Sequence, residues 1–155
     1  MNRSQYVPFE LPKLTNSSNT MIIPNGYFNG NSIASFNISN IGVLKSIVIG
    51  DYCFGMVRVF DLDRLDELES VVIGKESFTY AKTKEEIWYS ERSDGNYRIV
   101  NCPKLKSIQI GHWSFYDYHS FELNNLPSLQ SIAISVWCFR YAPSFSLTGL
   151  IDGLV

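Results

Sequence analysis

An internal repeat constrains this chain more than any other feature of its sequence. Residues 60–74 read FDLDRLDELESVVIG, and residues 121–135 read FELNNLPSLQSIAIS. Two further copies begin at Phe36 and Tyr97, and all four follow the template F-x-L-x-x-L-x-x-L-x-S-I-x-I-G with few departures. A repeat of this length predicts a solenoid, in which each copy stacks on the next.

The spacing of the copies gives a period of 24 residues. Phe36 and Phe60 are 24 residues apart, as are Tyr97 and Phe121, whereas Phe60 and Tyr97 are 37 apart, which is 24 plus an insertion of 13. A second aromatic column keeps the same register, five residues past the last isoleucine of each copy: Phe54, Phe78, Phe115 and Phe139. We therefore expect a degraded leading copy in residues 1–32. The solenoid proper then covers residues 33–155, with an insertion near 81–96 and an incomplete last copy from Phe145.

Within each copy, the stretches F-x-L and S-I-x-I alternate apolar residues with others. Alternation over so few residues predicts short strands, and no stretch has the apolar spacing of a confident helix. Each strand is expected to lie parallel to its counterpart in the next coil, about 4.8 Å away. One coil alone would not bury enough apolar surface to offset the ordering of its backbone, so stacking is required. The predicted fold class is mainly β: a solenoid of short parallel strands with little helix.

Composition excludes several classes of function. The net charge of −2 and a pI near 5.6 argue against nucleic-acid binding, which needs a basic face. No apolar stretch is long enough to span a membrane, and no signal peptide is visible before Pro8. The three cysteines form no CxxC pair, which predicts free thiols. We expect a cytoplasmic protein if Met1 is the native start, and a cell-surface protein if the chain is a fragment of a larger one.

The run Leu105-x-x-Ile108-x-Ile110 and its counterparts resemble the L-x-x-L-x-L core of leucine-rich repeats. The element that follows, such as Gly50-Asp-Tyr-Cys-Phe54, is similar to the BspA-like subclass found in bacterial and protist surface proteins. The resemblance implies a binding or adhesion module. It departs from common repeats where an asparagine ladder would lie, because the corresponding positions hold Tyr52, Glu76, Trp113 and Trp137. Aromatic packing at that bend is therefore expected in place of the ladder.

No pattern of residues indicates catalysis, and no cofactor or metal is expected. His112 and His119, near Asp117, are the only candidate histidine ligands, and they are interpreted as surface residues. An acidic cluster could hold calcium, although a solvated face of one coil is the favoured interpretation; it consists of Asp61, Asp63, Asp66, Glu67 and Glu69. Cys102 occupies a column of Ile and Leu residues, so it is predicted to be buried.

Two surfaces are candidates for binding another macromolecule. The first is the outward column of the S-I-x-I strands, formed by Val48, Val72, Gln109 and Ala133, beside a column of serines that could instead be a hydrogen-bonding ladder. The second is the insertion, where Trp88 and Tyr89 could anchor a partner or fold back onto the coil. We expect a protein partner and no enzymatic activity. The alternative is a structural segment that associates end to end.

Overall fold

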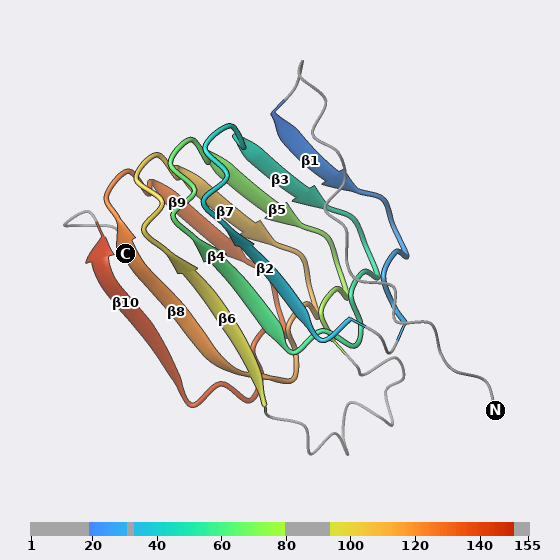
Figure 1. The fold of residues 1–155 in the computed structure, drawn as a ribbon. Coiled ribbons are helices and arrows are strands. Elements are labelled where there is room, and N and C mark those ends of the chain that lie inside the picture. The colour runs from blue at the N-terminus through green and yellow to red at the C-terminus, as the bar shows by residue number, and fades with distance from the viewer. Residues whose placement is uncertain (1–18, 31–32, 80–93, 151–155) are drawn as a thin grey trace.

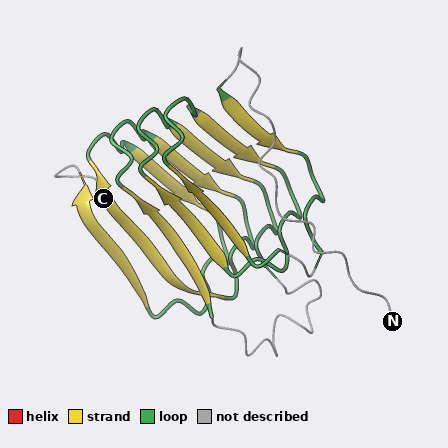
Figure 2. Cartoon of the chain, in the orientation of Figure 1, coloured by secondary structure: helices red, strands yellow, loops and turns green. Residues whose placement is uncertain are grey.

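The computed structural model describes residues 19–30, 33–79 and 94–150. Over these residues the chain forms a parallel β-solenoid of about five turns with a 24-residue period and no helix. Figure 1 shows two layers of strands joined by bends at both ends of each strand, and Figure 2 shows only strands and loops. The predicted fold class is confirmed.

Each coil contributes one strand to each of two five-stranded parallel sheets. The S-I-x-I stretches build the first sheet, called sheet A, in the order β1 (Thr20–Ile23), β3 (Ser46–Ile49), β5 (Ser70–Ile73), β7 (Ser107–Ile110) and β9 (Ser131–Ile134). The F-x-L stretches build sheet B, in the order β2 (Ser35–Ser39), β4 (Val59–Asp63), β6 (Gly95–Val100), β8 (Tyr118–Leu126) and β10 (Ser144–Leu150).

The pairing register follows the repeat residue by residue. Ser46 lies opposite Ser70, which lies opposite Ser107, and the latter lies opposite Ser131. The step from Ser70 to Ser107 contains the insertion, yet the register of sheet A is the same there as between the other coils. The degraded leading copy also contributes a strand, because Thr20 in β1 lies opposite Ser46.

Two columns of aromatic rings run through the core from coil to coil. Phe54 and Phe78 stack at 4.9 Å between ring centroids, and Phe60 and Tyr97 stack at 4.8 Å. These distances match the separation of neighbouring strands, so each ring lies on its counterpart in the next coil. The columns meet edge to face, as where Tyr97 and Phe115 lie 4.9 Å apart. Cys102 is fully buried in the same core, as predicted.

At the bend after sheet A, three coils have a glycine where a side chain would collide with the backbone of the preceding coil: Gly50, Gly74 and Gly111. A Cβ atom on Gly111 would lie 2.6 Å from the backbone of Gly74 and Lys75, so only glycine fits there. The same bend contains a ladder of hydroxyl groups. Ser77 Oγ donates to the Gly50 carbonyl at 2.8 Å and accepts the Cys53 amide at 3.1 Å, and Ser114 repeats this pattern one coil on.

The start of β6 differs from the predicted boundary of the insertion. Gly95 and Asn96 were assigned to the insertion near 81–96, but both belong to β6. The register of β6 against β8 shifts between these two residues. A Cβ on Gly95 would meet the ring of Tyr118, which explains why the strand begins with glycine. The remainder of the insertion lies mostly outside the described residues.

Candidate binding surface

The predicted outward column of sheet A is a continuous row on the surface. Val48 lies opposite Val72, then Gln109 and Ala133 follow on the next two strands. Val48 and Val72 are half-buried, whereas Gln109 and Ala133 are exposed. Ile22 on β1 extends the row and is 62% exposed. We call this row, Ile22 included, the sheet A ribbon. It carries no charge, and its residues are apolar except for Gln109.

The serine column beside the ribbon makes a hydrogen bond between coils. Ser46 Oγ and Ser70 Oγ are 2.9 Å apart, which is the contact expected of a ladder. On the far side of this column, Lys106 Nζ lies 2.8 Å from Glu69 Oε2, and their hydrogen bond lowers the pKa of Glu69. The border of the ribbon at these two coils therefore carries a pair of opposite charges that neutralise each other.

The acidic cluster of residues 61–69 is paired with cations of the following coil. Arg98 lies 3.1 Å from Asp61, and Lys104 lies 2.6 Å from Glu67. Arg98 also approaches Glu122 at 3.5 Å, which extends the ion pairs over three coils. Within the part of the chain that the structure describes, no group of three or more His, Cys, Asp or Glu residues is placed to hold a metal ion. The paired carboxylates favour the interpretation as one face of a coil.

A cluster of aromatic side chains lies at the bend that follows sheet A. Trp113 stacks on Trp137 at 5.5 Å with a 22° angle between the rings, and on Tyr116 at 5.4 Å with 23°. Tyr141 meets Tyr116 edge to face at 5.5 Å. The guanidinium carbon of Arg140 lies 5.2 Å from the centre of the Trp137 ring. We call these five residues the aromatic cluster.

The aromatic cluster is distinct from the main core. Tyr116 is buried and packs with the partly buried Trp113 in a separate apolar group. Burial and the neighbouring Tyr141 hydroxyl raise the pKa of Tyr116 to about 12, so it stays neutral near physiological pH. Trp137 is 44% exposed and Tyr141 38% exposed, next to Val136 at 65%. A base of stacked rings thus presents an exposed tryptophan, tyrosine and arginine to the solvent.

The sequence predicted aromatic packing at this bend but did not predict the cluster. Trp113 and Trp137 share the column that also holds Tyr52 and Glu76, so their stacking follows from the period. The contributions of Tyr116, Arg140 and Tyr141 depend on how the chain leaves the bend. Tyr116 and Arg140 lie 24 residues apart in one column, but Gly55 and Thr79 hold that column in the earlier copies, so only the tertiary structure reveals the cluster.

The other sequence-predicted residues are placed as follows. Trp88 and Tyr89 lie outside the described residues. His119 is exposed on β8 and His112 is partly buried at the bend, where its carbonyl accepts the Glu76 amide at 2.9 Å. Asp117 is buried and accepts hydrogen bonds from Arg58 at 3.0 and 3.1 Å. Asp117, the carboxylate nearest to the two histidines in sequence, is therefore paired with Arg58.

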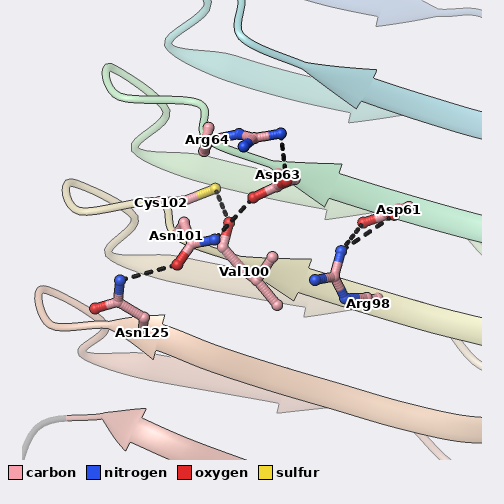
Figure 3. A network of polar contacts seen from close by, with 8 residues as sticks. All are labelled: Asp61, Asp63, Arg64, Arg98, Val100, Asn101, Cys102 and Asn125. Carbon is pink, nitrogen blue, oxygen red and sulfur yellow. Dashed lines mark hydrogen bonds and ion pairs between the residues drawn. The ribbon is translucent and has the colours of Figure 1, made fainter.

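The structure contains an asparagine ladder at the bend that follows sheet B. The bend that follows sheet A, where common leucine-rich repeats would suggest a ladder, has none among the described residues. Asn125 donates to Asn101 Oδ1 at 2.9 Å, and Asn101 donates to Asp63 at 2.9 Å, as Figure 3 shows beside the Arg98–Asp61 pair. Asn101 directly follows β6 and Asn125 lies near the end of β8, and both have positive φ, 55° for Asn101 and 54° for Asn125. Asparagine tolerates this conformation better than most residues, which was a usable signal in the sequence.

Comparison with known proteins adds no family to this description. No family model, no curated protein and no solved structure matches the chain. Across the described ranges, no helix is long and apolar enough to cross a membrane. The fold and surface define a class, a parallel β-solenoid with a repeating 24-residue coil, whose function has to be argued from its own residues.

Proposed function

We propose that this protein is a recognition module that binds a protein partner through the aromatic cluster and the sheet A ribbon, without catalytic activity. The observation that carries the proposal is the exposed Trp137, held in place by Trp113 on one side and accompanied by Arg140 and Tyr141. Tryptophan, tyrosine and arginine supply most of the binding energy in protein interfaces.

The stacking of Trp137 on Trp113 supports this assignment. A tryptophan that is already stacked loses little conformational freedom when a partner covers it, so more of the contact energy remains as affinity. The ribbon continues the same surface, because Ala133 precedes Val136 by three residues, a path of about 10 Å in extended chain. A partner could therefore contact exposed aromatic groups at the bend and flat, uncharged strands beside them.

The same proposal includes membership of the BspA-like leucine-rich repeats. Its support is the L-x-x-I-x-I register of sheet A together with the repeated G-x-x-(C/S)-F bend, in which serine and cysteine side chains bind the preceding coil. That subclass is associated with surface recognition, which agrees with an adhesion role.

The test is capture of a binding partner by the wild-type chain and by folded variants. The double variant Trp137→Ser/Tyr141→Ser is expected to lose the partner, because both side chains are exposed and their removal leaves the core intact. Loss of about tenfold to a hundredfold in affinity is expected for a central hot spot. Tyr52→Ser is the matched control, since Tyr52 is 46% exposed in the same column but on an earlier coil.

A ribbon variant, Val72→Arg/Gln109→Glu/Ala133→Arg, separates the two parts of the surface. Loss of binding in this variant alone would transfer the site to the strands, and retention in both variants would make the insertion around Trp88 the candidate. A wild-type chain that captures nothing specific would contradict the proposed function.

A further inference from the structure

The residues Asn37-Ile38-Ser39 match the acceptor sequence of N-linked glycosylation, N-x-S/T with x other than proline. They form the greater part of β2, where buried and exposed side chains alternate. Phe36 and Ile38 are 0% and 2% exposed in the core, whereas Asn37 and Ser39 are exposed. The asparagine amide and the serine hydroxyl of the motif therefore lie on the same outer face of sheet B.

The two exposed side chains of the motif are not used by the fold. Within the ranges that the structure describes, no side chain bonds to the amide of Asn37 or to the hydroxyl of Ser39. Opposite them on β4 lie Asp61 and Asp63, which bind side chains of the following coil at 3.1 and 2.9 Å. The neighbouring strand thus leaves the asparagine amide available for modification.

The position of Asn37 has a different chemistry in the following coils. Asp61, Arg98 and Glu122 occupy it on β4, β6 and β8. Arg98 pairs with Asp61 at 3.1 Å and with Glu122 at 3.5 Å, which explains why charged residues lie on those strands. Asparagine is depleted in strands, and no contact in the described structure explains its presence in β2. A glycan acceptor accounts for both the asparagine and the serine two residues later.

The place of Asn37 in the fold leaves the proposed recognition surface uncovered. Sheets A and B form two layers around the core, so their outward residues lie on opposite sides of the solenoid (Figure 1). The sheet A ribbon therefore faces away from β2. The aromatic cluster follows β7 and β9, the last two strands of sheet A, whereas β2 is the first strand of sheet B along the chain. A bulky, hydrated oligosaccharide on Asn37 would block neither surface.

We propose that Asn37 carries an N-linked oligosaccharide in the native protein. Its Nδ2 atom forms a bond to the anomeric carbon of a lipid-linked oligosaccharide and releases one proton to a base of the transferase. The bond from that carbon to the lipid diphosphate breaks, and its electron pair leaves with the diphosphate, so no oxidant or reductant takes part. Ser39 supplies the hydroxyl that the acceptor sequence requires. The proposal rests on the surface role proposed above, because such transferases act on chains that leave the cytoplasm.

Mass spectrometry of the chain isolated from its source organism tests the proposal. Peptide N-glycosidase in heavy-oxygen water converts a glycosylated asparagine to aspartate and labels it. The label is expected at Asn37 and absent from Asn40, which is also exposed but has Gly42 where the hydroxyl residue is required. An unmodified Asn37 would overturn the proposal, as would a label confined to Asn2 and Asn16, the asparagines of the other two acceptor sequences.

Variants expressed in the same organism test the role of the hydroxyl. Ser39→Ala should remove the glycan, whereas Ser39→Thr should retain it, because threonine keeps the acceptor hydroxyl. Asn37→Gln should lose the glycan and keep the fold, since its side chain lies on the outer face, and circular dichroism checks the folding. A glycan that persists at Asn37 in Ser39→Ala would contradict the proposal.

Partner capture is measured on the same preparations, so that the two proposals can be told apart. A chain that carries the glycan but captures nothing contradicts the recognition function alone. A chain that captures its partner while Asn37 is unmodified contradicts the glycan alone.

Discussion

At the scale of single residues, Tyr97 places a polar hydroxyl group at a core position where other copies of the repeat have phenylalanine. It occupies the column held by Phe36, Phe60 and Phe121, and its ring stacks on Phe60 and Phe121 at 4.8 and 4.9 Å. Its hydroxyl is buried and makes no hydrogen bond in the described structure. Burial raises its pKa, which keeps the phenol protonated. The ring contributes packing, but the hydroxyl loses its hydration without replacement.

Tyr97→Phe should therefore stabilise the protein. Removing an unsatisfied buried hydroxyl, while the stacked ring is retained, is expected to raise the free energy of unfolding by about 1 kcal/mol. Urea denaturation followed by circular dichroism measures the change. The control is Tyr118→Phe, which should destabilise, because the Tyr118 hydroxyl donates to the Val57 carbonyl at 2.7 Å. Destabilisation by Tyr97→Phe would show that its hydroxyl has a partner.

At the scale of elements, side chains next to β4 and β8 contact each other across β6, the strand that lies between them. Arg58 precedes β4 and Asp117 precedes β8, yet the two side chains meet at 3.0 Å although β6 lies between their strands. Tyr118 spans the same distance to reach Val57, and Gly95 leaves room for its ring. These contacts therefore join the coils on either side of the β6 coil directly to each other.

Breaking the Arg58–Asp117 pair should cost more than breaking an ion pair on the surface. Arg58→Met leaves a fully buried carboxylate without its cation and is expected to lower the free energy of unfolding by about 3 kcal/mol. Arg64→Met is the matched control, because Arg64 is 61% exposed and pairs with Asp63 at the surface, where about 0–1 kcal/mol is expected.

The double variant Arg58→Met/Asp117→Leu identifies the origin of that loss. Because it removes both charges, it should recover most of the stability that Arg58→Met alone loses. Chemical denaturation of the four proteins gives the comparison. Equal losses in Arg58→Met and Arg64→Met would show that the buried pair has no special contribution.

At the scale of the whole molecule, the core holds ionisable groups in their neutral form. Burial raises the pKa of Cys102 and of Cys138 to about 11 each, from an ordinary value of 9.0. Tyr118 is likewise raised by burial from 10.0. In the unfolded chain these groups release their protons at lower pH than in the folded chain. The folded state therefore binds more protons in this range, and its stability must fall as pH rises.

The expected outcome is a loss of stability that begins near pH 9 and continues to about pH 11. Below pH 9 the thiols are protonated in both states and contribute no pH dependence. Urea midpoints measured at increasing alkaline pH give the slope, and Cys102→Ala should reduce it whatever its effect on stability at neutral pH. A midpoint that does not change over this range would contradict the placement of these groups in the core.

The repeat columns were enough to predict the solenoid, the two strands of each coil and their parallel register. The reason is that residues in phase every 24 positions have one shared environment, so Phe60, Tyr97 and Phe121 had to stack. The same columns placed Cys102 in the core and Val48, Val72, Gln109 and Ala133 on the surface.

The tertiary structure decided everything that departs from the period. Tyr116 and Arg140 are 24 residues apart and share a column, but earlier copies hold Gly55 and Thr79 there, so the period did not indicate that they and Tyr141 join the two tryptophans. Arg58 and Asp117 are far apart in the sequence and became partners because β6 leaves space between their strands. A period determines what happens in every coil, whereas contacts formed in one coil alone depend on the three-dimensional path of the chain.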